Sequence, residues 1–207
     1  PRPNPQTLYL IEGSGYIFRA YYAIKSTMTN PQGVPVNAVY GFTSMLLKLL
    51  QDMQAEHIAV VFDVSRVTFR NRIYDAYKAN RPPPPDDLIP QFALVRDAAD
   101  ALSIPRVEVP DFEADDLIAT YAREARAKGM EVIVVTSDKD LMQLIAEGVS
   151  IYDPMKQKSI SDADVLEKFG VKPDRVRDVL ALMGDSSDNV PGVPGIGPKT
   201  AMELINQ

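Results

Sequence analysis

Residues 8–15 read LYLIEGSG, an apolar run that ends on a carboxylate, Glu12, followed by a Gly-Ser-Gly turn. The run Leu8–Ile11 is typical of a strand that is buried on both faces of a parallel sheet. Three more runs of this kind follow along the chain: Ile58–Phe62, Val132–Thr136 and the shorter Val149–Tyr152. Segments with helical periodicity separate these runs, which indicates an α/β fold with a mostly parallel sheet flanked by helices.

The helical segments carry apolar residues at every third or fourth position. They are Val39–Met53, Phe92–Leu102 and Leu117–Ala125, and Gly129 is placed to end the last of them. After about Pro173 the pattern changes to a helix, an acidic loop, a Gly/Pro hairpin and a second helix that can begin at Pro198. We therefore predict a main domain over residues 1–172 and a small helical subdomain over residues 173–207.

The composition narrows the chemistry that is open to this chain. Its 207 residues are 45% hydrophobic, enough for a packed core, and no apolar run approaches the roughly 18 residues of a membrane span, so no membrane partner is expected. The chain has no cysteine and a single histidine, His57, which excludes a disulfide framework and argues against a usual zinc site. A metal would have to be held by oxygen atoms, which points to Mg²⁺ or Mn²⁺.

Carboxylates follow the ends of three predicted strands. Glu12 ends the first strand and Asp63 the second, while Asp138 and Asp140 follow the third after a tight turn. In open parallel sheets, ligands bind beyond the carboxyl ends of the strands. The sequence therefore predicts that these acids meet at one edge of the sheet.

Two more acidic segments join this set. DFEADD supplies Glu113, Asp115 and Asp116 at a helix start, and MGDSSD supplies Asp185 and Asp188. Each acid alone also fits a structural role, as a turn residue, an N-cap or a partner of the helix dipole. Nine carboxylates in one cleft, however, would raise one another's pKa and destabilise the fold unless cations balanced them. The pattern predicts a site for two divalent metals about 4 Å apart, the arrangement that serves in-line phosphodiester cleavage.

The net charge of −6 argues against a nucleic-acid partner, but its distribution does not. Residues 64–81 carry a local charge of +4, with Asp75 as their one acid, and without the nine acids above the chain would have a net charge of +3. A helix across this segment would place five residues on one face: Arg70, Tyr74, Tyr77, Lys78 and Arg81. Cations between aromatic rings suit single-stranded nucleic acid better than the alternative, a solvated face with tyrosines on the core. Lys78 and Arg81 are the candidates to reach a scissile phosphate.

The hairpin GVPGIG, residues 192–197, precedes the last predicted helix. Its glycines Gly192, Gly195 and Gly197 expose backbone amides near a helix N-terminus, with Lys199 in the helix itself. This arrangement binds phosphate without reading base sequence. We expect it to contact duplex DNA.

Five stretches together resemble the 5′-nuclease (flap endonuclease) superfamily, and in particular the N-terminal 5′–3′ exonuclease domain of bacterial DNA polymerase I. They are LIEGSGYIFRAYYA, VVFDVSRVTFRNRIYDAYKANRPPPPDDL, FEADDLIATYA, VVTSDKDLMQLI and MGDSSDNVPGVPGIGPKTA. The resemblance implies a PIN-like domain, a helical arch over about residues 64–85 and a helix-3-turn-helix element over residues 174–206. It also implies that Tyr77, Lys78 and Arg81 lie beside the scissile phosphate. The matching acids take the metal-centre roles: Asp63, Glu113, Asp115, Asp116, Asp138, Asp140, Asp185 and Asp188.

The resemblance further implies a Mg²⁺- or Mn²⁺-dependent 5′ nuclease of replication and repair. Its substrate would be DNA with a 5′ flap, a nick or a 5′ end, including RNA-primed ends. It would be a monomer in the bacterial cytoplasm, with the nucleoid, and fused to or acting with a DNA polymerase. In relatives the hairpin can also hold K⁺.

The chain departs from the family pattern at two places, and two alternative functions stay open. Glu12 stands where the family has Asp, so the chain could be a DNA-structure-binding module whose catalysis is impaired. A PIN-type ribonuclease would share the sheet and the acids, although the arch and the hairpin argue against it. The chain also stops at Gln207, where relatives continue, so the helical subdomain is expected to be truncated.

Overall fold

The computed structural model describes residues 6–25 and 28–207. Within these ranges six strands form one sheet in the order β3-β2-β1-β4-β5-β6, parallel except for β6 at one edge. The strands are β1 Thr7–Glu12, β2 His57–Val61, β3 Arg106–Val107, β4 Glu131–Val135, β5 Val149–Asp153 and β6 Lys158–Ile160. The mostly parallel sheet is therefore confirmed. The sequence did not predict β3 and β6, since two or three residues are too few for a periodic pattern to show.

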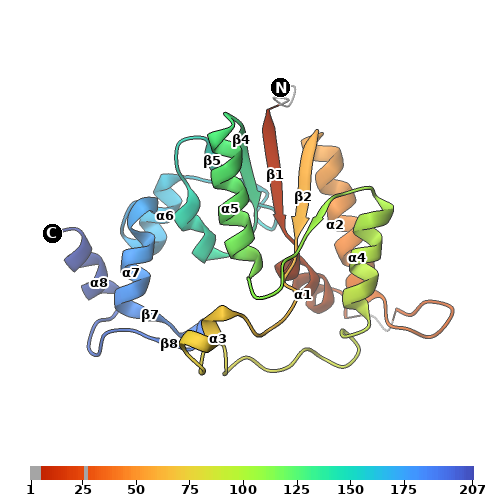
Figure 1. Ribbon diagram of the computed structural model, residues 1–207, viewed down its shortest axis with the longest axis horizontal. Helices are drawn as coiled ribbons and strands as arrows, with labels where there is room; N and C mark the ends of the chain where they lie inside the picture. The colour runs from red at the N-terminus through yellow and green to blue at the C-terminus, as the bar shows by residue number, and fades with distance from the viewer. Residues whose placement is uncertain (1–5, 26–27) are drawn as a thin grey trace.

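Helices cover both faces of the sheet (Figure 1). One face carries α1 Gly13–Ala23, α2 Asn37–Met53 and α4 Gln91–Ala101, and the other carries α5 Ala114–Ala127, α6 Asp162–Phe169, α7 Val176–Met183 and α8 Pro198–Ile205. Neighbouring strand residues point to opposite faces: Leu10 lies in the core beneath α5, and Ile11 lies in the core beneath α1 and α2. Burial on both faces explains the unbroken apolar strands. In the described part of the chain, no helix combines the length and the apolar character that a membrane span requires.

The three helices predicted from periodicity are confirmed as α2, α4 and α5, and Gly129, with φ +77°, follows the end of α5. The prediction of a turn at Gly-Ser-Gly after Glu12 is wrong, because residues 13–15 form the first turn of α1. Glu12 is the N-cap of this helix, and its Oε1 accepts a hydrogen bond of 2.6 Å from Gly15 N. A capped helix start and a turn share the same residue types, so the sequence did not separate them.

The continuous helix expected over residues 70–81 is also wrong. Helix α3, Phe69–Ile73, ends before Tyr74, which is extended, and Lys78 has φ +55°. Four hydrogen bonds draw the following residues onto the acidic loop at 186–189: Lys78 N to Asp188 O, Asn189 Nδ2 to Ala76 O, Asn80 Nδ2 to Ser186 O, and Arg81 Nε to Ser187 O. These contacts to a distant segment outweigh the local helical preference. Residues 64–85 are called the arch segment below.

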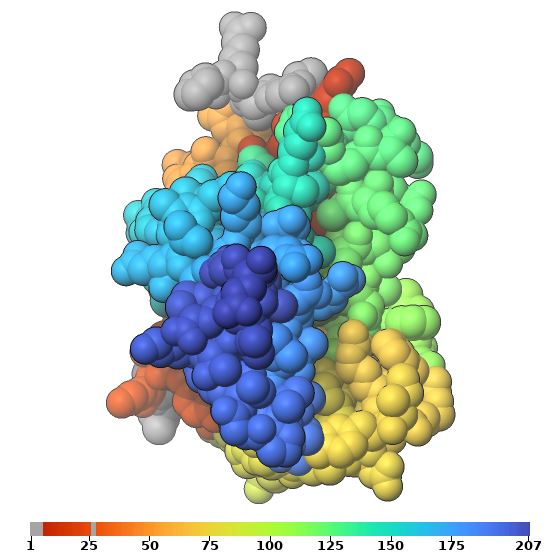
Figure 2. All heavy atoms as spheres, turned by 90° about the vertical axis from the view of Figure 1, so that its left-hand side faces the viewer, coloured from red at the N-terminus to blue at the C-terminus, as the bar shows by residue number. Residues whose placement is uncertain are grey.

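The C-terminal part follows the predicted order of helix, acidic loop, hairpin and helix. The 3₁₀ turn Pro173–Arg175 leads into α7, and strands β7 Gly184–Asp185 and β8 Val190–Pro191 enclose the turn Ser186–Asp188. Helix α8 begins at Pro198, as expected. Figure 2 shows this segment, in blue, beside the arch segment, in yellow. Val176, Val179 and Ala201 are buried in the core of the α5 face, while the boundary at residue 172 stays a prediction, and residues 1–5 lie outside the described residues.

The close packing of α1 on β2 generates a stability prediction. A Cβ on Gly13 would lie 2.6 Å from a ring carbon of Phe62 and 2.7 Å from Cγ1 of Val60, both buried. We expect Gly13→Ala to lower the free energy of unfolding by about 1–3 kcal/mol, because a packed core cannot move the ring away without strain. Urea denaturation measures this change.

Gly197→Ala is the matched control, since a Cβ there meets open space. It should change stability by less than about 0.5 kcal/mol. A loss in Gly13→Ala that is no larger than the loss in Gly197→Ala would contradict the packing argument.

Candidate metal centre

Seven of the nine predicted acids form two groups at the carboxyl ends of the strands. The inner acids are Glu12, Asp63, Asp115 and Asp138, whose charges act on one another. The outer acids are Asp140, Asp185 and Asp188, which each offer one carboxylate oxygen within 4.8 Å of the others. Asp138 links the groups, because its charge also acts on Asp140. All five predicted segments thus contribute to these seven acids.

The inner acids are poorly balanced by protein cations. Burial raises the pKa of Glu12 to about 8, and the charges of Asp138 and Asp63 add to this against the Gly15 hydrogen bond. Burial also raises the pKa of Asp115 well above its usual range, with further contributions from the other inner acids. A bound divalent cation would reverse these shifts, since it favours the ionised form of every carboxylate around it.

The outer acids contain a buried oxygen that suits a metal ligand. Asp140 Oδ1 is buried and has no hydrogen-bond partner among the described residues, and Lys139 Nζ is 4.0 Å away. Burial, followed by the charge of Asp138, raises the pKa of Asp140 to about 6. Asp185 differs: burial opposes its ionisation, but hydrogen bonds from Ser187 and the nearby Lys139 lower its pKa overall. An unbonded carboxylate oxygen next to two other carboxylates fits an oxygen-coordinated divalent cation.

Glu113 and Asp116, the two remaining acids, lie at the start of α5 beside Asp115, and they bind the arch segment. Arg70 donates two hydrogen bonds of 2.7 Å to Asp116, and its Nη1 is 3.1 Å from Glu113 Oε2. Burial opposes ionisation of Asp116, yet Arg70 and the Glu113 backbone N–H lower its pKa. One arginine therefore binds both oxygens of Asp116, which distinguishes it from the inner and outer acids.

Three arch residues also contact the acids. Lys78 Nζ forms a short ion pair with Glu113, and Arg81 Nη2 lies 2.6 Å from Asp188 Oδ1. The Tyr77 hydroxyl donates to Glu113 Oε2 at 2.9 Å. The arch cations thus reach the acidic edge, although no continuous helix carries them there.

A cleft of about 430 Å³ lies between the arch segment and strand β8. Its lining residues are Arg70, Ile73, Tyr74, Tyr77, Val190 and Pro191. Tyr74 is 38% exposed and Ile73 is 78% exposed. The cleft therefore offers apolar and aromatic surface directly beside the arch cations.

The three hairpin glycines and Lys199 of α8 do not share one environment. Gly192 is packed so closely that a Cβ would lie 2.3 Å from the backbone of Met183, whereas Gly195 and Gly197 are exposed. The Lys199 side chain is 85% exposed and lies 4.0 Å from Glu203. Gly192 thus serves packing, while the other three residues lie at the surface.

The sequence missed several residues that contact the acids. Ser14 Oγ accepts a hydrogen bond from Asp63 N, Lys139 pairs with Asp185 at 3.4 Å, and Arg96 donates to the Asp63 backbone. Lys139 lies inside the motif DKD and could have been found there. Ser14 and Arg96 carried no signal, because a backbone contact depends on the tertiary fold.

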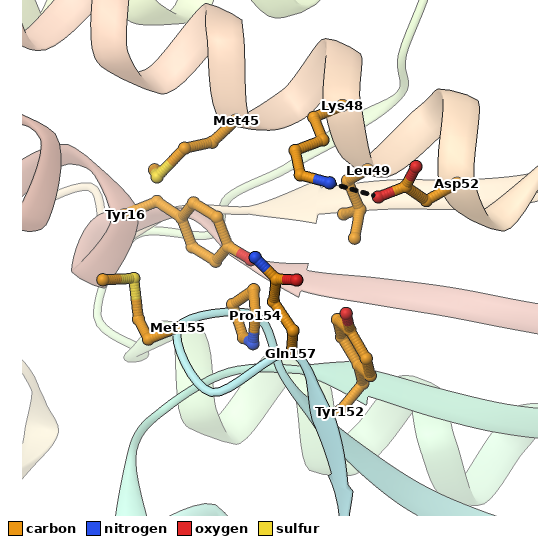
Figure 3. Close-up of a pocket in the computed structure, with 9 residues that line it drawn as sticks. All are labelled: Tyr16, Met45, Lys48, Leu49, Asp52, Tyr152, Pro154, Met155 and Gln157. Carbon is orange, nitrogen blue, oxygen red and sulfur yellow. Dashed lines mark hydrogen bonds and ion pairs between the residues drawn. The ribbon is translucent and has the colours of Figure 1, made fainter.

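A small hollow of about 60 Å³ lies among α1, α2 and the β5–β6 hairpin (Figure 3). Tyr16, one turn after Glu12, lines it with a buried hydroxyl that has no hydrogen-bond partner among the described residues. The basic side chain that lines the hollow, Lys48, is paired with Asp52 at 2.8 Å. The hollow has room for a few ordered waters, one of which would satisfy the hydroxyl, and it does not extend the basic surface of the arch segment.

Because the inner acids are crowded, we expect Asp115→Asn to change the free energy of unfolding in opposite directions with and without metal. In EDTA at pH 8, Asp115→Asn should raise the free energy of unfolding by about 1 kcal/mol, because it removes one of several repelling carboxylates. Folding raises the pKa of Asp115, so ionisation of this carboxyl group destabilises the folded state more as the pH rises. The gain from removing the charge should therefore be smaller at pH 5 than at pH 8. In excess Mg²⁺ the wild type should become the more stable form, because it binds the metal more tightly.

Thermal unfolding under the three conditions measures these differences. Asp97→Asn, an exposed change on α4, is the control and should have little effect in any of them. Destabilisation by Asp115→Asn in EDTA at pH 8 would show that the inner acids do not repel one another.

Comparisons with known proteins show the family of this chain. Residues 7–170 match the family described as 5′-3′ exonuclease, N-terminal resolvase-like domain, and residues 171–207 match 5′-3′ exonuclease, C-terminal SAM fold. The chain is 53% identical to DNA polymerase I of Rhizobium leguminosarum over 97% of its own length and 20% of that protein. It is 40% identical to a 5′-3′ exonuclease of Aquifex aeolicus, over 98% of this chain and 70% of the relative. The chain thus spans about a fifth of the polymerase relative and most of the exonuclease.

Solved structures share the fold. The T5 5′-exonuclease with divalent metal ions (zinc) bound has a TM-score of 0.79 at 23% identity, covering 97% of this chain and 74% of that one. The bacteriophage T5 D15 flap endonuclease in a pseudo-enzyme-product complex with DNA and metal ions has a TM-score of 0.78 at 22% identity, with the same coverage. At this identity the likeness concerns the fold alone.

Proposed function

The chain belongs to the 5′–3′ exonuclease family, and we propose that it is a divalent-metal-dependent 5′ nuclease that hydrolyses phosphodiester bonds in DNA flaps and 5′ ends. One observation carries the proposal. The outer acids, with the unbonded Asp140 Oδ1, lie beside Lys78 and Arg81, so that a metal site and phosphate-binding cations adjoin. The DNA-bound T5 flap endonuclease structure supports the choice of a branched substrate.

The inner and outer acids would hold two or more ions of Mg²⁺ or Mn²⁺. Glu113 would lie between these acids and the arch segment. When bound, such ions supply an activated water and neutralise the leaving oxygen. Asp116 would keep its place as the anchor of Arg70, because the two are joined by a bidentate pair of hydrogen bonds. Coordination by oxygen alone favours Mg²⁺ and Mn²⁺ over softer metals.

The arch cations would exchange carboxylate partners for phosphate. Lys78 and Arg81 can neutralise charge on the scissile phosphate, which a preorganised cation does more effectively than water. Arg70, Tyr74 and Tyr77 line the 430 Å³ cleft and would hold the adjoining single strand by ion pairing and stacking.

We assign duplex binding to the subdomain of residues 173–207. Gly195, Gly197 and Lys199 would contact the phosphate backbone at the start of α8, and K⁺ could be held by the hairpin carbonyls. Gly192 would permit the close approach of the hairpin to α7 that this surface requires.

The relatives support a proposal for the biological setting of the chain. Because DNA polymerase I contains a segment similar to this chain, we infer that the chain acts with or within a DNA polymerase. Its work would be the removal of 5′ ends, including RNA-primed ones, at the nucleoid in the bacterial cytoplasm. It would act there as a monomer.

The proposal is tested with a 5′-labelled flap, the chain and Mg²⁺. Short labelled products that vanish in EDTA are expected. No products in Mg²⁺ or Mn²⁺ would overturn the enzyme proposal. Single-stranded RNA in a parallel reaction tests the ribonuclease alternative, which gains support if the RNA is cut faster than the flap.

Lys78→Ala should separate catalysis from binding. We expect single-turnover cleavage to fall by about 10²-fold or more, because the lost cation acts on charge that develops in the transition state. Flap affinity, measured in Ca²⁺, should fall far less, since many phosphate contacts share it. Lys128→Ala, an exposed change beyond the end of α5, should alter neither quantity. Equal losses of rate and affinity in Lys78→Ala would contradict its role.

A second candidate function, flap binding without turnover, rests on Glu12. Its Oε1 is held by Gly15 N, and its Oε2 occupies the space that a Gly15 side chain would need. We expect the wild type to cut flaps, and Glu12→Asp to shift the Mg²⁺ concentration for half-maximal rate while leaving flap affinity unchanged. Tight binding without cleavage in the wild type, with cleavage restored in Glu12→Asp, would instead establish the second function.

A further inference from the structure

We propose that Arg96 is a positioning residue for the metal centre, which fixes the main chain at Asp63 where β2 passes into the arch segment. This inference rests on the proposed function only in taking Asp63 as a metal ligand. It concerns a residue of α4 that lies outside the motifs described above.

Asp63 lies beyond the last backbone hydrogen bond of its strand. That bond runs from Phe62 N to Val107 O, and the residues after Asp63 have exposed side chains, including Val64 and Val67. The sheet therefore does not fix the Asp63 peptide groups. Other contacts must do so if its carboxylate is to hold a metal with the necessary accuracy.

Three side-chain or backbone contacts take over from the sheet. Asp63 N donates to Ser14 Oγ at 3.0 Å, and Ala114 N donates to Asp63 Oδ1 at 2.7 Å. Arg96 Nη2 donates to Asp63 O at 2.9 Å. The first comes from α1, the second from the start of α5, and the third from α4. No described residue donates to Asp63 Oδ2, which leaves that oxygen for a cation.

Arg96 is itself held firmly. Its Nε pairs with Glu108 Oε2 at 2.8 Å, its Nη1 donates to Phe92 O at 3.0 Å, and its guanidinium lies 4.7 Å from the Phe62 ring centroid. Its side chain is 19% exposed. An arginine fork that is fixed by an ion pair and a ring face loses little further freedom when it binds one more carbonyl. Arg96 thus joins the ends of β2 and β3 to α4.

The same residue stabilises α5 indirectly. The Asp63 carboxylate that Arg96 helps to place caps Ala114 N, and α5 carries Glu113, Asp115 and Asp116 in its first turn and cap. A shift of the Asp63 backbone would therefore move an inner acid and loosen the start of the helix that holds another. Partners of metal ligands commonly change metal affinity by 10–100-fold when they are removed.

The chain offers a matched control in Arg106. Arg106 Nη1 also pairs with Glu108, at 3.0 Å, but its other partner is Asp100 and no contact joins it to Asp63 among the described residues. Arg96→Met and Arg106→Met remove the same kind of ion pair from the same carboxylate. Only the first removes the hydrogen bond to Asp63.

The test is Mn²⁺ binding to the full chain, followed by the electron paramagnetic resonance signal of free Mn²⁺, without DNA. Arg96→Met should raise the Kd for Mn²⁺ about tenfold, and Arg106→Met should change it less than twofold. Arg96→Lys keeps the charge opposite Glu108 but lacks the fork that reaches Asp63, so it should resemble Arg96→Met. It also serves as the test variant if Arg96→Met does not fold.

Unchanged Mn²⁺ affinity in both Arg96 variants would overturn the inference, as would an equal loss in Arg106→Met. A wild type that binds no Mn²⁺ would overturn it as well. If the wild type binds Mn²⁺ but cuts no flap, the proposed nuclease fails while the positioning role of Arg96 is still decided by the Mn²⁺ titrations.

Discussion

Carboxylates lie half-buried beside one another at the carboxyl ends of β1, β2 and β4, and their repulsion is the constraint on which the rest of the structure depends. Burial and neighbouring charges raise the pKa of Glu12 to about 8, so its ionised form is unfavourable without a cation nearby. A chain selected for stability alone would not gather so many acids at one place. The sheet holds them there because its strands are buried on both faces, which fixes where each strand ends.

The arrangement of cations follows from this repulsion. Lys78 and Arg81 leave the helical path expected of the arch segment and pair with Glu113 and Asp188, while Arg70, within α3, pairs with Asp116. The segment is therefore shaped by long-range ion pairs and by hydrogen bonds to the loop at 186–189 rather than by its own periodicity. The same cations are suited to phosphate, so one charge pattern explains both the folded arch and the proposed binding of DNA. Arg96 complements them at Asp63, where it donates to the backbone carbonyl group and not to a carboxylate.

Sequence reasoning was reliable where a residue's place depends on local pattern. The apolar runs located β1, β2, β4 and β5, and the acids that follow the first three were correctly expected at one edge. It failed where tertiary contacts decide the backbone. Tyr74 is extended although its neighbours favour a helix, and Gly13 begins a helix although Gly-Ser-Gly suggests a turn. Arg96 escaped notice because its partner is a carbonyl group, which no sequence pattern identifies.

The central claim is that the outer acids bind a divalent cation. A crystal structure of the chain grown with Mn²⁺, with anomalous scattering recorded, tests it most directly. We expect a Mn²⁺ peak within about 2.5 Å of carboxylate oxygens from Asp140, Asp185 and Asp188, with Asp140 Oδ1 among the ligands. A fully occupied Mn²⁺ elsewhere on the chain, with these three carboxylates bound only by protein groups, would contradict it.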